Sequence, residues 1–329
     1  MDKRLEQLTR WVEKALGIHN ADVTPASSDA SFRRYFRVRH DDQSYIVMDA
    51  PPDKEDCGLF IQVSAAMAGF GLNVPVVLQL DLGQGFLLLT DLGEQQYLRV
   101  LNPDNVDALY GDAIEALVRL QVNGVDSTLA LPIYDQQRLM VEMSLFSDWL
   151  VAKHVGLDLA PGQAKELKRT YGWLTEEALA QPLVFVHRDY HSRNLMLTSR
   201  NNPGILDFQD AVYGPVTYDL VSLLKDCYIS WPRDKVESWL ADYHDQIRQA
   251  GLAKFTSHEQ LLRWFDLMGV QRHLKAAGIF ARLNIRDGKP GYLHDIPRTL
   301  NYICEVAEWI PELRPLSQLI KGDVLPGLS

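Results

Sequence analysis

Residues 183–210 read LVFVHRDYHSRNLMLTSRNNPGILDFQD, and this stretch decides how the rest of the chain is interpreted. Short apolar runs within it predict strands at residues 183–186, 195–197 and 205–206. The segment between the first two runs, residues 187–194, is mostly polar and predicts a loop. We therefore expect short strands that deliver polar side chains to one edge.

Oxygen-bearing side chains follow these strands. Asp189 and Asn194 lie in the polar loop, and Asp207 comes directly after the third strand. A turn at residues 201–204 would fold the second strand back on the third, so we expect the three side chains to converge at one end of a hairpin. The alternative is a polar surface loop in which Asp and Asn are only turn residues.

The spacing of these residues matches a pattern of phosphoryl-transfer enzymes. The loop fits H-R-D-x-x-x-x-N from His187 onward; in kinases its Asp accepts the hydroxyl proton and its Asn binds Mg²⁺. Asp207 opens Asp-Phe-Gln, where many kinases have Asp-Phe-Gly, and its carboxylate would bind the same ion. The sequence therefore predicts Asp189 as the base, Asn194 and Asp207 as metal ligands, and ATP and Mg²⁺ as cofactors.

The composition is that of a globular enzyme with a substantial core. The chain has 329 residues, of which 47% are hydrophobic and 23% are charged, and its length suits two lobes. A net charge of −10 argues against nucleic acid or an anionic membrane as a partner. The charged N-terminus lacks a signal-peptide core, and no apolar run approaches the roughly 20 residues that span a bilayer. We expect a cytoplasmic monomer that acts on a small molecule.

The N-terminal part of the chain predicts a β-rich nucleotide-binding lobe, residues 1–91. Periodic apolar residues predict strands at residues 21–25, 32–40, 44–50, 74–80 and 85–90, with helices at 2–16 and 56–69. We expect the strands to form a five-stranded antiparallel sheet. In the second strand, alternation places Phe32, Phe36 and Val38 on one face.

The loop between the first two strands lies where a kinase binds phosphate. Ser28, Ser31 and backbone N–H groups would bind phosphate oxygens, next to Phe32 and with charge from Arg33 or Arg34. The loop has no glycine, so the alternative is an ordinary hairpin turn beside a solvated basic strand face.

The third strand departs from the kinase pattern. Met48 stands where a kinase has the lysine that pairs with the phosphates. Either Arg33, Arg34 or Lys54 replaces it, or Mg²⁺ carries more of the charge, or catalysis is lost.

Thr90, Asp91 and Leu92 end the last strand of this lobe. Their backbone would bind the adenine edge if the segment is a kinase hinge; the alternative is a simple linker. The rest of the chain, residues 92–329, predicts a mainly helical catalytic and acceptor-binding lobe.

Two features of the helical lobe concern the site. Asp219 begins an apolar helix, where it would either favour the helix dipole or brace the loop after His187 by accepting its N–H groups. Arg272, Lys275 and Arg282 lie on one expected helix, residues 258–282, and are either solvated or in contact with an acidic group of a substrate. The short interval between Asp207 and Asp219 leaves no room for a long activation loop, which argues against a protein kinase.

These motifs resemble those of the aminoglycoside phosphotransferase/choline kinase group. The shared residues are H-R-D-Y-H-x-x-N at 187–194, I-L-D-F at 205–208 and Y-D-L at 218–220. The resemblance implies an α+β, bilobal, protein-kinase-like fold with a small antiparallel N-lobe and a larger helical C-lobe. It also implies that His191, Gln209 and Asp210 lie near the acceptor.

Longer stretches resemble a bacterial branch of this group, the sugar kinases of cell-wall recycling. They are S-D-A-S-F-R-R-Y-F-R-V, Y-I-V-M-D-A-P-P and L-D-F-Q-D-A-x-x-G-P-x-x-Y-D-L. This resemblance implies phosphorylation of the anomeric hydroxyl of N-acetylmuramate and N-acetylglucosamine. The alternatives are an aminoglycoside O-phosphotransferase and a catalytically weak nucleotide-binding regulator.

Overall fold

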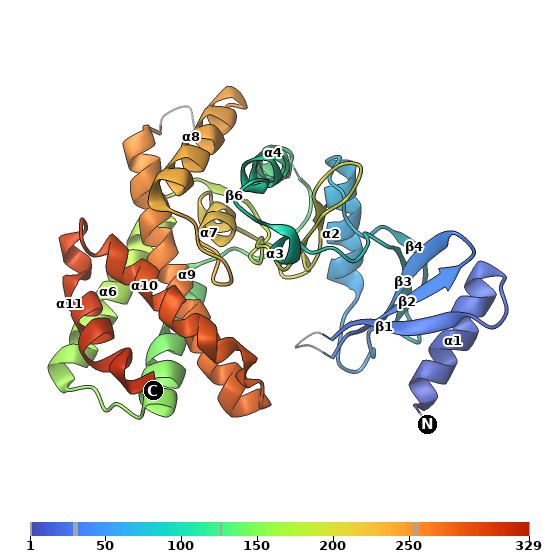
Figure 1. Ribbon diagram of the computed structural model, residues 1–329, viewed down its shortest axis with the longest axis horizontal. Helices are drawn as coiled ribbons and strands as arrows, with labels where there is room; N and C mark the ends of the chain where they lie inside the picture. Colours follow the sequence, from blue (N-terminus) through green and yellow to red (C-terminus); the bar gives the residue numbers. More distant parts are fainter. Residues whose placement is uncertain (1, 29–31, 126, 253–255, 329) are drawn as a thin grey trace. The chain divides into compact units, whose positions relative to one another are not determined.

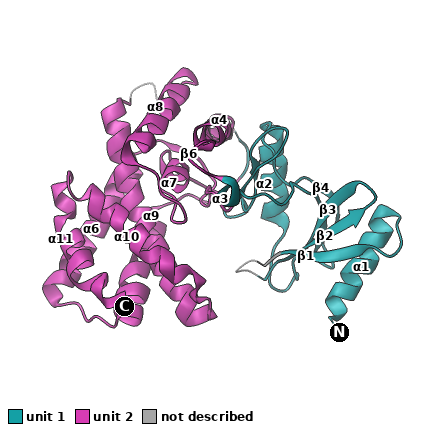
Figure 2. Cartoon of the chain, in the orientation of Figure 1, with its two compact units in different colours: residues 1–100, 127–129, 194–210 teal, residues 101–126, 130–193, 211–329 magenta. Residues whose placement is uncertain are grey.

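The computed structural model describes residues 2–28, 32–125, 127–252 and 256–328. The chain forms two compact units, residues 1–100, 127–129 and 194–210 in the first and residues 101–126, 130–193 and 211–329 in the second (Figures 1 and 2). The first unit therefore extends beyond residue 91, and residues 194–210 belong to it rather than to the second unit.

The first unit contains the expected five-stranded antiparallel sheet, and Figure 1 labels β1 to β4 of it. The strand order is β1-β2-β3-β5-β4. Its strands are β1 (Asp22–Ser28), β2 (Arg34–His40), β3 (Gln43–Asp49), β4 (Val77–Asp81) and β5 (Phe86–Thr90). Helix α1 (Lys3–Leu16) is amphipathic and buries Leu8 and Val12 in a cluster with Val38, Val47 and Leu88 of the sheet. Apolar alternation in the strands thus creates the surface on which α1 packs.

The prediction for Phe32 was wrong. Strand β2 begins at Arg34, and the Phe32 side chain is 64% exposed, whereas Phe36 and Val38 are buried. The last residue pair between β1 and β2 joins Ser28 to Arg34, so Phe32 lies in the connection before the strand. Its backbone N–H donates to Glu55 (3.1 Å) instead of to a neighbouring strand.

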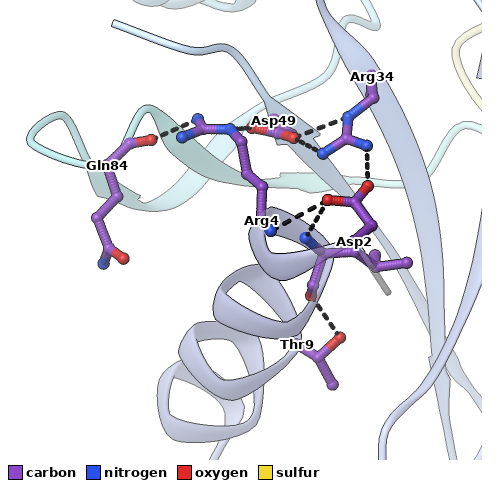
Figure 3. A network of polar contacts seen from close by, with 7 residues as sticks. Asp2, Arg4, Thr9, Arg34, Asp49 and Gln84 are labelled. Carbon is purple, nitrogen blue, oxygen red and sulfur yellow. Dashed lines mark hydrogen bonds and ion pairs between the residues drawn. The ribbon is translucent and has the colours of Figure 1, made fainter.

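A buried carboxylate ties α1 to the sheet (Figure 3). Asp49, at the end of β3, has no exposed surface and accepts hydrogen bonds from Arg4 Nε (2.6 Å) and Arg34 Nε (2.9 Å). Arg34 also pairs with Asp2, which caps α1 by accepting backbone N–H groups. Arg4 and Arg34 therefore stabilise the fold of this unit as partners of one buried charge.

The first unit also holds the predicted hairpin. Strands β7 (Leu195–Met196) and β8 (Gly204–Ile205) pair antiparallel, which confirms that the chain turns back between them. Bridges from Asn73 to Gly204 and from Gln96 to Met196 join the hairpin to the rest of the unit. The other helices of this unit are α2 (Gly58–Gly69) and α3 (Tyr97–Val100).

The second unit is mainly helical. Its longer helices are α4 (Val106–Val125), α5 (Gln136–Leu145), the π-helix η1 (Phe146–Val155), α6 (Pro161–Leu179), α7 (Tyr218–Leu224), α8 (Arg233–Gln249), α9 (His258–Asp287), α10 (Ile296–Val306) and α11 (Arg314–Leu319). Its shorter helices are η2 (Pro290–Asp295), η3 (Pro311–Leu313), η4 (Ile320–Val324) and η5 (Pro326–Leu328). None of the helices in the described part of the chain combines the length and the apolar character needed to cross a membrane.

Helix α9 is the centre of this unit and packs against α5, η1, α6, α7 and α10. A Cβ atom at Gly278 would lie 2.3 Å from the carbonyl carbon of Leu145, so glycine permits the close approach of α5 to α9. The central position explains why α9 is buried along most of its length, including positions that carry charge.

Strand β6 (Leu183–Val186) lies where the sequence predicted it, but its partner was not expected. It pairs antiparallel with β9 (Val212–Pro215), joining Val186 to Val212 and Leu183 to Pro215. After β9, helix α7 begins at Tyr218, one residue before Asp219. The Asp219 carboxylate, in the first turn of α7, joins this helix to the residues that follow β6. These two segments hold the part of the candidate site that lies in the second unit.

Candidate active site

In the second unit, the loop after β6 is held at its start by Asp219. The Asp219 carboxylate, in the first turn of α7, accepts the backbone N–H groups of His187 (2.6 Å) and Arg188 (2.9 Å). This is the contact that a loop-bracing carboxylate requires. Burial raises the pKa of Asp219 to about 7, although the two N–H groups oppose this shift. Arg188 has a φ of 80°, a left-handed conformation that such bracing stabilises.

Asp226 holds the same loop at its other end. It accepts the backbone N–H of Ser192 (3.0 Å) and the Ser192 hydroxyl (2.5 Å), and all of these groups are buried. We did not predict this residue. One feature of the sequence could have indicated Asp226: it lies just after the apolar helix α7. The helix dipole disfavours a negative charge at this end, so a carboxylate there needs another partner.

Asp189 lies between these two anchors and carries a negative charge at neutral pH. Burial raises the pKa of Asp189, but the charges of Lys275 and Arg272 outweigh it and hold the pKa below its ordinary value. His191 adds to this effect only when protonated, and burial lowers its own pKa. Asp189 is therefore a carboxylate that can accept a hydrogen bond and then a proton.

The cations around Asp189 come from α9 and from the loop itself. Arg272 and Lys275 are both buried, so the interpretation of these two side chains as solvated is wrong. Lys275 Nζ donates to the Tyr218 hydroxyl (2.9 Å), and Arg272 donates to the backbone carbonyl of Arg188 (3.3 Å). Charged positions on an amphipathic helix usually face water, but α9 has protein on nearly every side.

Glu142 on α5 partly balances these cations, and we did not predict it. It pairs with Arg188 and with Lys275 (3.2 Å), and it accepts a hydrogen bond from the Tyr134 hydroxyl. Burial raises the pKa of Glu142, but the charges of Lys275 and Arg188 hold it below its ordinary value. No sequence signal marks Glu142, because acidic residues on helices are common.

In the first unit, the two predicted metal ligands lie side by side. Asn194, just before β7, donates from its amide nitrogen to Asp207 Oδ2 (3.3 Å). The Leu206 N–H donates to the Asn194 carbonyl (2.9 Å), which holds the ends of the hairpin together. Asp207 has a φ of 65°, a left-handed conformation that is uncommon for a residue other than glycine.

Gln209 and Asp210 differ from each other in their surroundings. Gln209 is buried and donates to Asp207 Oδ1 (2.6 Å), so it contacts the expected metal ligand directly. The Asp210 side chain is exposed. Whether either residue contacts an acceptor stays a prediction.

Asn194 and Asp207 fit Mg²⁺, because together they offer a carboxylate and an amide oxygen. Among the described residues, no three His, Cys, Asp or Glu side chains cluster as a self-sufficient metal site. Such a poor protein ligand set suits Mg²⁺, which usually takes one or two carboxylates and completes its shell with phosphate oxygens and water. That Asp189 of the second unit meets this pair stays a prediction.

The expected phosphate-binding residues belong to the first unit. Ser31 lies outside the described residues, and Ser28 ends β1. Arg33 forms an ion pair with Glu55 (2.9 Å). Met48, in the place of the kinase lysine, is completely buried.

The hinge candidates have structural contacts of their own. The Asp91 carboxylate accepts hydrogen bonds from Arg37 Nε (2.6 Å) and the Ser44 hydroxyl (2.5 Å), so its side chain holds the sheet. Thr90 Oγ1 accepts the Val76 N–H (2.9 Å). The prediction for Leu92 concerns its backbone N–H and carbonyl groups, which would form hydrogen bonds with the adenine edge.

Comparison with known proteins identifies the family. Residues 22–258 match the model of the phosphotransferase enzyme family. The chain belongs to this family. It is 48% identical to the N-acetylmuramate/N-acetylglucosamine kinase of Pseudomonas putida over 97% of this chain and 96% of that protein. It is 43% identical to the protein of the same name from Neisseria meningitidis, over 97% and 95% of the two chains.

Solved structures share the fold. An ADP-bound aminoglycoside phosphotransferase, APH(2'')-Ib, is 16% identical, with a TM-score of 0.58 over 92% of this chain and 98% of that one. Choline kinase LicA from Streptococcus pneumoniae is 11% identical, with a TM-score of 0.65 over 93% and 100%. The expected bilobal α+β kinase-like fold and the resemblance to this group are confirmed, and the chain is a small-molecule phosphotransferase.

Asp219→Ala is expected to destabilise the protein, because it leaves two backbone N–H groups unsatisfied next to a strained residue. The expected loss in the free energy of unfolding is roughly 2 to 4 kcal/mol, measured by urea denaturation. Asp219→Asn keeps one acceptor oxygen in place and is the matched control, with a smaller expected loss. Equal and negligible losses in both variants would show that Asp219 does not brace the loop.

Proposed function

We propose that this protein is an ATP- and Mg²⁺-dependent kinase that phosphorylates the anomeric hydroxyl of N-acetylmuramate and N-acetylglucosamine, as part of peptidoglycan recycling. The names of its relatives at 43–48% identity support the acceptor. The observation that carries the catalytic part of the proposal is the anchored, ionised Asp189.

In the proposed reaction, Asp189 positions the anomeric hydroxyl and takes its proton. The hydroxyl oxygen forms a bond to the γ-phosphorus, the bond from that phosphorus to the β,γ-bridging oxygen breaks, and ADP leaves. An anomeric hydroxyl is more acidic than other sugar hydroxyls, so a carboxylate with a low pKa suffices as its base. Arg272 and Lys275 keep Asp189 in the charged state that can accept the proton.

We assign Asn194 and Asp207 as the residues that hold Mg²⁺. A bound Mg²⁺ would neutralise charge on the phosphate oxygens. Gln209 supports this pair by fixing one oxygen of Asp207, which leaves the carboxylate in a defined orientation. Asp219, through His187 and Arg188, keeps Asp189 in place.

For the nucleotide we propose Ser28, Ser31, Phe32 and Arg33 beside the phosphates and the backbone of residues 90–92 beside the base. The ion pair of Arg33 with Glu55 is the same kind of pair that a kinase lysine forms with its glutamate, which supports Arg33 as the replacement for Met48. Of the other two candidate cations, Arg34 is engaged by Asp49, and Lys54 lies beside Asp53 (3.9 Å). Because ATP is available in the cytoplasm, we place the reaction there.

The proposal is tested by measuring ADP release with N-acetylmuramate, N-acetylglucosamine and kanamycin as acceptors. We expect turnover with the two N-acetylated sugars and none above background with kanamycin. NMR of the product should show phosphate on the anomeric oxygen. Turnover with kanamycin alone would favour an aminoglycoside phosphotransferase, and nucleotide binding without turnover of any acceptor would favour a regulator.

Asp189→Asn is expected to lower kcat by about 100-fold or more, because the amide cannot take the hydroxyl proton. Binding of Mg·ATP, measured by calorimetry, should be largely retained. Asp245→Asn, an exposed position on α8, is the control and should keep normal turnover. Turnover of Asp189→Asn close to that of the native protein would remove Asp189 from the mechanism.

Lys275→Met is expected to raise the pKa of Asp189, because it removes the nearby positive charge that favours the carboxylate. Activity that depends on ionised Asp189 is lost as the pH falls through this pKa. The acidic limb of the profile of kcat/KM against pH should therefore move to higher pH. Lys168→Met, at an exposed position on α6, should leave the limb in place. An unmoved limb in Lys275→Met would contradict this account.

A further inference from the structure

An arginine at the end of the catalytic loop is held between aromatic rings. The guanidinium carbon of Arg193 lies 4.0 Å from the ring centroid of Tyr228 and 5.1 Å from that of Tyr292. Tyr292, in η2, stacks on Phe280 of α9, with centroids 5.6 Å apart and an interplanar angle of 16°. The rings restrict the guanidinium without using its N–H groups, because a cation–π contact engages the face of the group.

Arg193 differs from the other cations of the site in its partners; Arg272, which also forms no ion pair within the described residues, donates to the Arg188 carbonyl. Arg188 and Lys275 pair with Glu142, whereas Arg193 forms no ion pair and donates no hydrogen bond within the described part of the chain. Arginine presents a planar set of N–H donors that matches a carboxylate in a bidentate manner. A half-buried guanidinium that is fixed but not neutralised is suited to an anionic ligand.

The surroundings of Arg193 connect it to the proposed acceptor site. The ring of His191 meets that of Tyr228 edge to face, with centroids 5.4 Å apart. The backbone N–H of His191 donates to the backbone carbonyl of Asp189 (3.0 Å). Burial lowers the pKa of His191, the charges of Asp226 and Asp189 oppose this shift, and those of Arg272 and Arg193 add to it. An acceptor whose hydroxyl reaches Asp189 would therefore extend past His191 towards Arg193.

We propose that Arg193 binds the carboxylate of an acidic acceptor sugar and determines how well this enzyme uses it. The inference rests on the proposed function. N-acetylmuramate carries a lactyl carboxylate, and N-acetylglucosamine is the same sugar without it. Arg193 is thus a specificity residue for the acidic acceptor, and the neutral acceptor is bound without its help.

The test compares both sugars in the native protein, Arg193→Met and Arg193→Lys. Arg193→Met keeps the length of the side chain and removes its charge. It should lower kcat/KM for N-acetylmuramate by about 10- to 100-fold, the scale of a lost hydrogen bond between charged groups, and change that for N-acetylglucosamine by less than about threefold. Arg193→Lys should fall between. Arg169→Gln, at an exposed ion pair on α6, is the control and should change neither value.

A chemical variant of the substrate repeats the test in the native protein. The methyl ester of N-acetylmuramate lacks the negative charge, so the native protein should use it as poorly as Arg193→Met uses the acid. Arg193→Met should use acid and ester equally well.

A parallel loss for both sugars in Arg193→Met, with a higher KM for ATP, would overturn the inference and assign Arg193 to the nucleotide. Equal use of acid and ester by the native protein would overturn it as well. Failure of the native protein to phosphorylate either sugar would instead refute the proposed function.

Discussion

The site depends on two buried carboxylates that accept hydrogen bonds from backbone N–H groups of the loop at residues 187–194. Asp219 accepts the N–H groups of His187 and Arg188, and Asp226 accepts that of Ser192. Between these anchors the loop has little freedom, which keeps Arg188 in a left-handed conformation and fixes the position of Asp189. Phosphoryl transfer requires mainly positioning and charge, so a loop held at both ends is the main structural requirement.

Charge balance around Asp189 is the second requirement. Arg188, Arg272 and Lys275 supply three buried or half-buried positive charges, and Glu142 compensates only part of them. The excess keeps Asp189 ionised although burial favours its neutral form. Arg193 differs from Arg188, Arg272 and Lys275 in its surroundings. Within the described residues, it is the one of these four cations that packs between two tyrosine rings. We infer that its charge is compensated by the acceptor.

Much of this was predictable from sequence, because local patterns determine it. The strand at 183–186 and the hairpin after it follow from apolar runs separated by turn residues, and the five-stranded sheet follows from alternation. Alternation also misled us at Phe32, since it continues past the true start of β2. Strand β9 was missed because its Gly214 and Pro215 are typical of loops.

The residues that tertiary packing brings to the site were harder to predict. Glu142 and Asp226 contact the loop from distant parts of the chain, and no local pattern distinguishes a bracing carboxylate from a solvated one. The burial of Arg272 and Lys275 depends on the central position of α9, which periodicity alone does not reveal. Sequence motifs therefore indicated the reactive residues, and the structure was needed to find the residues that hold and charge them.

The most direct test of the central claim is a crystal structure of the protein with Mg²⁺ and a non-hydrolysable ATP analogue. The account predicts Asn194 and Asp207 oxygens at about 2.0–2.1 Å from the ion, the usual Mg²⁺–oxygen distance. Asp189 should lie off the metal, with its carboxylate directed to the γ-phosphate side where an acceptor hydroxyl would enter. An ion bound by other residues, or Asp189 as one of its ligands, would contradict the account.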